Sequence, residues 1–216
     1  MRRNTATDNV VRQQKATLRQ RLRQLRRTIP PGDADAHTRA IIARMQSLEV
    51  LVRASTVHTY WPAEKALEID LRTLIYWLRA RGKQIVLPIV EHSPDAPTMS
   101  HARFTGMCDL ERNAWGILEP KSGKRVDPQE IDAVVVPAFG AGRNGHRVGY
   151  GKGYYDAFLQ HVNAPLLCPV YADCLVDHCP AEPHDVCMDI LITENEILWP
   201  ARDNEQPNAH STNGLA

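Results

Sequence analysis

A glycine-rich segment late in the chain combines the residue types that bind phosphate. Three cations, Arg143, Arg147 and Lys152, lie in it, and the acid Asp156 follows. The segment comes after an apolar run and before a predicted helix, whose free N–H groups and partial positive charge favour phosphate. A carboxylate at Asp156 could hold a magnesium ion that bridges the phosphates. The glycines of the segment are Gly140, Gly142, Gly145, Gly149, Gly151 and Gly153.

Two common nucleotide motifs fit this segment only by letter. Gly140-Ala-Gly-Arg-Asn-Gly145 matches G-x-G-x-x-G, but loop follows it instead of the helix that a dinucleotide fingerprint requires. A Walker A motif is excluded because Gly153 follows Lys152 where Ser or Thr is needed. The pattern therefore indicates a phosphate or nucleotide site of another kind. A flexible loop would explain the glycines, but not the Tyr154-Tyr-Asp156 run beside them.

Charge is unevenly distributed along the chain. The net charge is +1, and 43% apolar with 24% charged residues is ordinary for a soluble globular protein. Residues 1–27 contain nine Lys and Arg residues but one acid, Asp8, a net +8 that leaves −7 on the remainder. This start resembles an organellar transit peptide in composition. A nucleic-acid-binding protein stays open as an alternative, although the basic segment lacks interleaved aromatic residues. A helix that belongs to the folded domain and takes part in its function explains this basic segment better.

Cysteine usage and hydropathy favour a cytoplasmic protein without a membrane partner. The five cysteines are odd in number, form no C-x-x-C pair and follow no apolar signal peptide, so a disulfide framework is not expected. His178 and His184 lie among the last four cysteines, but the spacings do not match a structural zinc module. No stretch approaches the ~20 apolar residues that span a membrane.

Hydrophobic periodicity predicts four helices that would position the glycine-rich segment. The first covers residues 10–27 and stops at Ile29-Pro-Pro-Gly32. The second is capped by Asp33 or Asp35, and the third is capped by Asp70 and ends at Gly82. The fourth covers residues 154–162. The buried positions expected in the second and third helices are Ile41, Ile42, Met45, Leu48, Leu71, Leu74, Ile75 and Leu78.

Short apolar runs predict the strands, at residues 55–61, 84–90, 98–104, 131–137, 166–171 and 190–193. The nearly continuous apolar character of residues 84–90 and 131–137 suits parallel strands that are covered on both faces. Residues 111–130 are expected to be mostly loop. The alternation of strands and helices predicts a single-domain, three-layer α/β/α fold with a largely parallel, Rossmann-like sheet over residues 1–199. Residues 200–216 are expected to be a disordered tail, and the order of residues 1–9 is left open.

Several motifs together resemble the 5-formyltetrahydrofolate cyclo-ligase family, also called methenyltetrahydrofolate synthetases. The longest is Asn144-Gly-His-Arg-Val-Gly-Tyr-Gly-Lys-Gly-Tyr-Tyr-Asp156, which looks like the family signature. Over residues 11–195, four further motifs resemble family segments: Lys15-Ala-Thr-Leu-Arg19, Glu68-Ile-Asp70, Trp115-Gly-Ile-Leu-Glu-Pro120 and His184-Asp-Val-Cys-Met-Asp189. One departure is plain, because Ala141 and Gly142 replace the Phe and Asp that the family usually shows before the basic loop.

The resemblance implies a reaction and its chemistry. Family members use ATP to convert 5-formyltetrahydrofolate into 5,10-methenyltetrahydrofolate, ADP and phosphate. ATP phosphorylates the formyl oxygen, N10 attacks the activated carbon, and phosphate leaves. Phosphoryl transfer depends mainly on positioning and charge neutralisation. The resemblance therefore implies Arg147 and Lys152 as catalytic cations, with Asp156 and Asp189 as ligands of Mg²⁺.

Two overlapping binding sets follow from the same resemblance. The residues implied at ATP are Lys15, Arg19, Arg147, Gly149, Tyr150, Gly151, Lys152, Gly153, Tyr154 and Tyr155. The residues implied at the folate are Glu68, Trp115, Tyr150, Gly151, Lys152, Gly153 and Tyr154. The Glu68 carboxylate suits the N–H groups of a pterin, and the Trp115 ring could stack on it. By themselves, Lys15 and Arg19 would be solvated charges, and Trp115 a core aromatic.

The expected partners are small molecules, a folate and ATP, with no nucleic acid and no membrane. We expect a monomer. A sugar-phosphate or acyl-transfer enzyme on the same α/β scaffold stays open as the alternative, because a fold alone does not determine function. The Lys15 and Arg19 pair, together with the glycine-tyrosine signature, separates the two readings.

Overall fold

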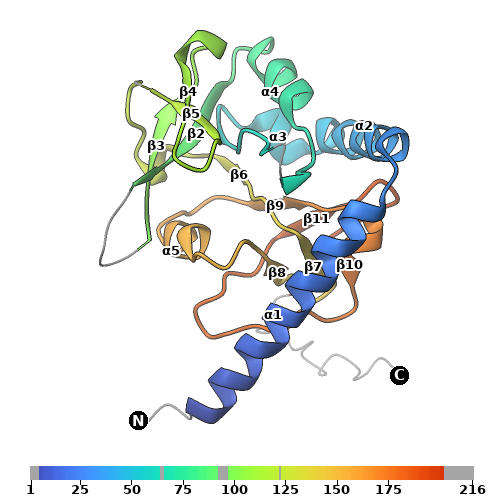
Figure 1. Ribbon diagram of the computed structural model, residues 1–216. Coiled ribbons are helices and arrows are strands. Elements are labelled where there is room, and N and C mark those ends of the chain that lie inside the picture. Colours follow the sequence, from blue (N-terminus) through green and yellow to red (C-terminus); the bar gives the residue numbers. More distant parts are fainter. Residues whose placement is uncertain (1–4, 64–65, 92–96, 122, 202–216) are drawn as a thin grey trace, which may run out of the picture.

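The computed structural model describes residues 5–63, 66–91, 97–121 and 123–201 (Figure 1). The expectations for residues 1–4 and for most of the tail, residues 202–216, lie outside these ranges. Residues 5–9 are helical, so the first helix starts earlier than the sequence pattern indicates. Among the described helices, none is both long and apolar enough to cross a membrane.

A mixed sheet forms the centre of the fold, with strand order β12-β11-β9-β6-β1-β2-β3. The neighbours from β11 to β2 pair in parallel, whereas β12 and β3 pair antiparallel at the two edges. The prediction of a largely parallel sheet is confirmed. Its strands are β1 (Thr56–His58), β2 (Gln84–Glu91), β3 (Thr98–Arg103), β6 (Ala133–Val135), β9 (Leu166–Pro169), β11 (Ile190–Ile192) and β12 (Ile197–Leu198).

Helices cover both faces of this sheet, which gives the predicted three layers (Figure 1). The helices are α1 (Thr5–Thr28), α2 (Pro31–Ser47), α3 (Glu49–Arg53), α4 (Arg72–Arg79) and α5 (Tyr154–Leu159), with 3-10 turns at Met107–Asp109, Pro128–Glu130 and Ala172–Cys174. One hydrophobic cluster joins the sheet to α1, α2, α3 and α4, and a second joins its other face to α5. Because residues alternate between the faces of a strand, Val135 enters the first cluster and Val134 the second.

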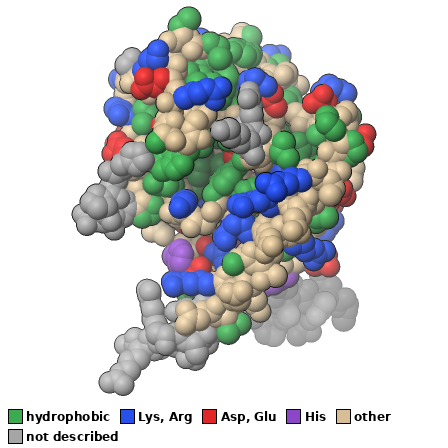
Figure 2. All heavy atoms as spheres, viewed as in Figure 1, with side chains coloured by type: hydrophobic (Ala, Val, Ile, Leu, Met, Phe, Trp, Pro, Cys, Tyr) green, Lys and Arg blue, Asp and Glu red, His purple; other side chains and the backbone are tan. Residues whose placement is uncertain are grey.

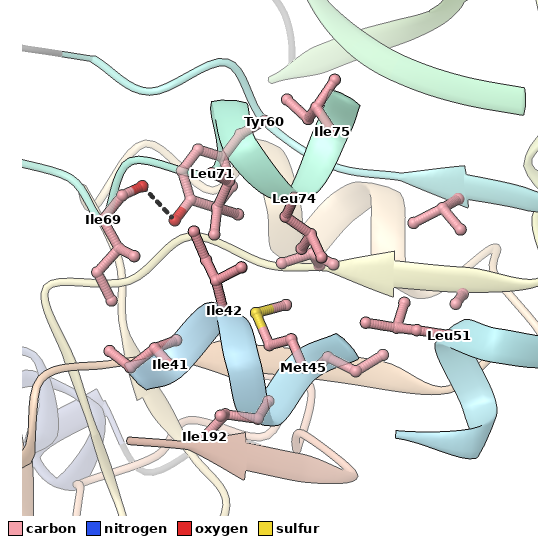
Figure 3. Close-up of a cluster of buried hydrophobic side chains, with 14 of the residues drawn as sticks. Ile41, Ile42, Met45, Leu51, Tyr60, Ile69, Leu71, Leu74, Ile75 and Ile192 are labelled. Carbon is pink, nitrogen blue, oxygen red and sulfur yellow. Dashed lines mark hydrogen bonds between the residues drawn. The ribbon is translucent and has the colours of Figure 1, made fainter. Parts of the chain in front are cut away.

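The first cluster buries the apolar stripes of α2 and α4 against each other and against the sheet (Figure 3). Ile41 and Met45 of α2 and Ile75 of α4 have no exposed surface, as their helical spacing predicts. At its border the Tyr60 hydroxyl donates to the carbonyl oxygen of Ile69 over 3.3 Å, which holds the loop between β1 and α4 against the core. This loop carries Glu68.

Three local predictions need correction. Helix α2 begins at Pro31 without a side-chain cap, so neither Asp33 nor Asp35 is its cap. Helix α4 begins at Arg72, although the Asp70 carboxylate does accept the Arg72 N–H over 3.0 Å. Helix α5 ends at Leu159, three residues earlier than expected.

Two small sheets replace segments that the sequence pattern leaves as loop. An antiparallel hairpin of β4 (Leu110–Arg112) and β5 (Leu118–Pro120) lies within the supposed loop at residues 111–130. Within the glycine-rich segment, β7 (Gly140–Gly142) pairs with β8 (Arg147–Val148) and with β10 (Leu175–Val176). These strands are two or three residues long, which is too short for a periodic pattern to show.

The chain reverses direction across the sheet between β1 and β6. From β1 it continues to β2 and β3 on one side, and it returns to β6, β9 and β11 on the other. In open α/β sheets, the crevice outside the carboxyl ends of such strands is where ligands bind. Here the loops that leave these two strands are the Glu68 loop, after β1, and the glycine-rich segment, after β6.

Candidate active site at the switch point of the sheet

The glycine-rich segment presents its backbone to helix α1. Gly151 and Gly153 have φ angles of +79° and +76°, in the left-handed region that favours glycine. A Cβ atom at Gly151 would lie 3.0 Å from Cζ of Arg19, so the missing side chain also allows close approach. The Arg19 Nε–H donates to the carbonyl oxygen of Gly149 over 2.8 Å. The loop and the helix are therefore held together by an arginine that the sequence already indicated.

Lys15, one helical turn before Arg19, is buried and not a solvated surface charge. Its Nζ lies 2.6 Å from the Asp185 carboxylate and 3.4 Å from that of Glu182. Glu182 also accepts from Arg12 over 2.9 Å. Burial alone would raise the pKa of Asp185, but hydrogen bonds from the Glu182 N–H and Lys15, with the Lys15 charge, lower it overall. The acid is thus kept ionised beside the lysine.

Strand β8 and helix α5 supply a second charge pair. The Arg147 guanidinium, only 7% exposed, lies 2.9 Å from the Asp156 carboxylate in the first turn of α5. Lys152, between them in the sequence, is exposed. A predicted catalytic cation and a predicted metal ligand therefore lie in contact at the start of the helix, where anions bind favourably.

Helix α1 brings these two charge pairs to the same region of the fold. It contacts β8, which carries Arg147, and its Lys15 pairs with Asp185 of the segment at residues 182–185. Burial raises the pKa of the Cys179 thiol to about 11, and the charges of Lys15, Asp185, Arg147 and Arg19 act on this thiol. Sequence reasoning missed Glu182 and Asp185, whose only signal was an acid beside the closing His184.

The Glu68 loop forms the opposite side of the site. The Glu68 carboxylate accepts the Ala63 N–H over 2.7 Å and the Tyr150 hydroxyl from the glycine-rich segment. Burial raises the pKa of Glu68, while these two hydrogen bonds and the Arg26 charge oppose the rise. Leu67, just before it, has a φ of +51°, a strained conformation for a leucine. The structure therefore brings together Glu68 and Tyr150, two residues of the set implied at the folate, and their contact with a folate stays a prediction.

Buried polar atoms without protein partners gather beneath Tyr155. The Tyr155 hydroxyl and His58 Nδ1 are buried, and the described residues offer neither of them a hydrogen-bond partner. The His58 and Tyr155 rings are 6.1 Å apart, so these two groups, from β1 and α5, are neighbours. Buried polar groups usually find partners, and unpaired ones tend to mark functional sites. Figure 2 shows this side of the molecule, with a hollow lined by hydrophobic side chains and with Lys and Arg side chains beside it along α1.

Comparison with known proteins identifies the family. The sequence profile of the 5-formyltetrahydrofolate cyclo-ligase family matches residues 11–194. The chain belongs to this family. It is 30% identical to the 5-formyltetrahydrofolate cyclo-ligase of Mycolicibacterium smegmatis over 83% of this chain and 93% of that one. It is 29% identical to the Escherichia coli 5-formyltetrahydrofolate cyclo-ligase over 82% of this chain and 98% of that one.

Solved structures agree with this assignment. The NMR structure of Aquifex aeolicus 5,10-methenyltetrahydrofolate synthetase superposes with a TM-score of 0.76 at 28% identity, covering 91% of this chain and 99% of that one. A 5,10-methenyltetrahydrofolate synthetase from Mycoplasma pneumoniae has a TM-score of 0.66 at 21% identity, covering 83% of this chain and 98% of that one, and supports the fold alone. The α/β fold with a largely parallel sheet that the sequence predicts is therefore confirmed.

Asp189, expected to share a metal with Asp156, is placed elsewhere. Its carboxylate accepts the Leu166 N–H over 2.8 Å, at the amino end of β9, and it lines an open groove of about 440 Å³ beside Trp199. Asp189 therefore lies at the amino ends of the parallel strands, whereas the Glu68 loop and the glycine-rich segment leave from their carboxyl ends. The fold does not bring Asp156 and Asp189 together, because Asp189 begins a strand that runs parallel to β9.

Trp115 and Tyr154 are positioned less specifically than the cyclo-ligase comparison predicts. Trp115 is 48% exposed in the turn between β4 and β5, so it is not a core aromatic. Its backbone N–H donates to the Asn113 side chain over 2.9 Å, which shapes the turn. Tyr154 is half-buried at the first position of α5. Their contacts with a folate stay predictions.

The departure from the cyclo-ligase pattern at Ala141 and Gly142 has a local structural reason. A Cβ atom at Gly142 would overlap the Asn144 side chain and the Cys179 backbone, so no aspartate fits there. The Asn144 side chain instead accepts the Cys179 N–H over 3.1 Å and donates to the Cys179 carbonyl oxygen over 3.1 Å. Ala141 is fully buried in β7. The turn is therefore held by an asparagine and the backbone of a neighbouring segment.

Proposed function

We propose that this chain uses ATP to close 5-formyltetrahydrofolate to 5,10-methenyltetrahydrofolate, with both substrates meeting between the Glu68 loop and the glycine-rich segment. The observation that carries the proposal is the hydrogen bond from Tyr150 to Glu68. It joins the proposed phosphate-binding loop to a half-buried carboxylate at the switch point of the sheet. Family membership supports the reaction, and this contact supports the proposed place at which the γ-phosphoryl group and the formyl oxygen meet.

The phosphate side is suited to phosphoryl transfer because its cations are already in place. Arg147 and Lys152 flank the glycines whose backbone would follow the phosphates, and Arg19 fixes the loop from α1. In the proposed reaction the γ-phosphoryl group moves to the formyl oxygen, and N10 then attacks the formyl carbon. The carbon–oxygen bond breaks, phosphate leaves with that oxygen, and N10 loses its proton. Positioned cations stabilise the negative charge of such a transfer.

Residues that fit a magnesium ion lie on the same side. Magnesium binds one or two carboxylates together with substrate phosphates. Asp156, at the start of α5, meets this requirement, and Asp185 replaces Asp189 as the second carboxylate because it lies on the Lys15 side of the site. When bound, the ion would neutralise phosphate charge. In the protein alone, Lys15 pairs with Asp185 and Arg147 pairs with Asp156. When ATP binds, the two cations would pair with its phosphates instead.

The folate side offers fewer charges and more aromatic surface. Glu68 would accept N–H groups of the pterin, while Tyr150 and Tyr154 contact the substrate and Trp115 stacks on its ring. A buried carboxylate discriminates strongly, because a ligand without matching N–H groups leaves it unpaired. We further propose that the enzyme acts as a cytoplasmic monomer, in keeping with its free cysteines, Cys108, Cys168, Cys174, Cys179 and Cys187.

The proposal is tested by following the methenyl chromophore. Purified protein is incubated with 5-formyltetrahydrofolate, Mg²⁺ and ATP, and parallel reactions omit one component. We expect methenyl product only in the complete mixture. Absence of product at high enzyme concentration, with the protein folded by circular dichroism, would overturn the proposed function.

A further inference from the structure

Arg26 is a buried cation that no predicted binding set includes. It lies seven residues after Arg19, about two helical turns further along the same face of α1. Only 3% of its surface is exposed, whereas the neighbouring Arg27 is exposed. Among the described residues, no carboxylate lies within ion-pair distance of Arg26. A guanidinium buried without a paired acid is costly, so its retention requires a reason.

The Arg26 side chain contacts both loops of the site. One terminal nitrogen donates to the carbonyl oxygens of Ala138 and Phe139, the latter over 3.1 Å, at the start of the glycine-rich segment. The other terminal nitrogen reaches the carbonyl oxygen of Ala66, in the Glu68 loop, over 3.5 Å. The Arg26 guanidinium therefore connects the two loops that leave β1 and β6.

An aromatic contact extends this connection to the substrate side. The Arg26 guanidinium lies 5.2 Å from the centre of the Phe139 ring, and that ring is 4.7 Å from the Tyr150 ring. Tyr150 in turn donates to Glu68. Arg26 therefore acts on Glu68 from two directions, through the Ala66 backbone and through Phe139 and Tyr150.

The charge of Arg26 also acts on Glu68. Burial raises the pKa of Glu68, and the Arg26 charge is among the influences that lower it. The other groups that face Glu68 are the hydroxyls of Tyr60, Tyr150 and Tyr155. These hydroxyls are uncharged, so Arg26 supplies the positive charge in this group of side chains around Glu68.

We infer that Arg26 is a positioning residue, which holds the Glu68 loop against the glycine-rich segment and so fixes the place of Glu68 for the folate. The inference rests on the proposed function. A purely structural role would require only that Arg26 fasten α1 to the sheet. The two roles differ in their consequences, because fastening α1 affects both substrates, whereas positioning Glu68 affects the folate.

The test compares Arg26→Met, Arg26→Lys and, as the matched control, Arg27→Met in steady-state kinetics. For Arg26→Met we expect the KM for 5-formyltetrahydrofolate to rise about 10-fold, the effect of losing one charged hydrogen bond, while the KM for ATP changes less than about 3-fold. Without the Arg26 charge the pKa of Glu68 rises further, so the acidic fall of kcat/KM for the folate moves to higher pH. Arg26→Lys should restore this pH profile but not the full affinity, and Arg27→Met should match the wild type.

A double variant keeps the test informative if Arg26→Met does not fold. In a Glu68→Gln background, Arg26→Lys should add nothing to the folate KM, because the effect passes through Glu68. Equal changes in both KM values, an unmoved pH profile, or additive effects in the double variant would each overturn the inference. Wild-type turnover, measured alongside, reports on the proposed function itself. Its absence overturns both, whereas a normal wild type with unchanged Arg26 variants overturns only the role of Arg26.

Discussion

The phosphate side and the folate side of the site differ in the groups that surround their charged residues. On the phosphate side, Lys15 pairs with Asp185 and Arg147 pairs with Asp156, so each of these two cations has an acidic partner within 3 Å. On the folate side, Glu68 is surrounded by aromatic rings and backbone groups, and burial raises its pKa. A cation that is already paired with a protein carboxylate has lost much of its hydration. It can therefore exchange this carboxylate for a phosphate without a large further cost of desolvation. A buried lone acid instead selects for a ligand that supplies N–H groups.

This contrast suits a site that receives a highly charged triphosphate on one side and an uncharged pterin ring on the other. Tyr150 and Arg26 connect the loops of the two sides. We therefore expect substitutions on the phosphate side to lower turnover, and substitutions on the folate side to weaken folate binding. The following experiments either sharpen this division or break it.

Lys152→Ala should have the largest effect. Lys152 is exposed, so its loss should leave the fold intact, but removal of one transition-state cation commonly costs about 100- to 1,000-fold in kcat. We expect a loss of this size with a small change in the folate KM. Lys121→Ala, also exposed, is the matched control. Near wild-type turnover would remove Lys152 from the site and break the division on its phosphate side.

Glu68→Ala tests the other side. The substitution leaves N–H groups of the pterin without an acceptor, which should raise the folate KM about 10- to 100-fold while the KM for ATP stays within about 3-fold. Steady-state titration of each substrate at saturating amounts of the other measures both values. Equal increases in the two KM values would contradict a folate-side role and argue that Glu68 supports the whole loop.

A smaller effect concerns stability beneath helix α5, where His58 and His101 pack against Phe158. His58 Nε2 and His101 Nδ1 are 3.2 Å apart and buried. Burial lowers the pKa of both, that of His101 to about 4, with help from the His101 charge at His58 and the Arg125 charge at His101. The unfolded chain therefore takes up protons below about pH 6.5 that the folded chain does not, so the free energy of unfolding falls as pH falls.

Urea unfolding between pH 7 and pH 5 measures this loss. We expect the free energy of unfolding to fall by about 1 kcal/mol per histidine over this range, after allowing for partial titration. The double variant His58→Leu/His101→Leu should show a flatter dependence, and the exposed His161→Leu should behave as the wild type. The same slope in wild type and double variant would show that these histidines do not titrate differently on folding.

Long apolar runs made most of the fold predictable from the sequence. Residues 84–90 and 131–137 could only be covered strands, and the stripes of Ile41, Met45 and Leu74 could only face a core. The two small sheets were missed, because strands of two or three residues have no periodicity. The cap of α2 was misplaced because Pro31, which suits the first helical position, competes with the acids that follow it.

Prediction of the site depended on whether its residues lie in motifs. Arg19, Tyr150 and Glu68 do, and the structure joins the segments that carry them. Arg26 lies in none of the motifs and acts through contacts between segments that are far apart in the sequence, which no spacing reveals. Asp185 lies in the closing motif, but the pattern did not show that this aspartate, and not Asp189, faces Lys15. Asp189 shows the opposite failure, because a motif letter gives no information about which edge of the sheet it occupies.

The most direct test of the account is the stoichiometry of the wild-type reaction. ATP consumed, phosphate released and methenyl product formed are measured together, with and without 5-formyltetrahydrofolate. A site in which the two sides must be filled together predicts one phosphate for each methenyl product, and no ATP consumption without the folate. Phosphate released in excess of methenyl product, or released equally without the folate, would contradict it.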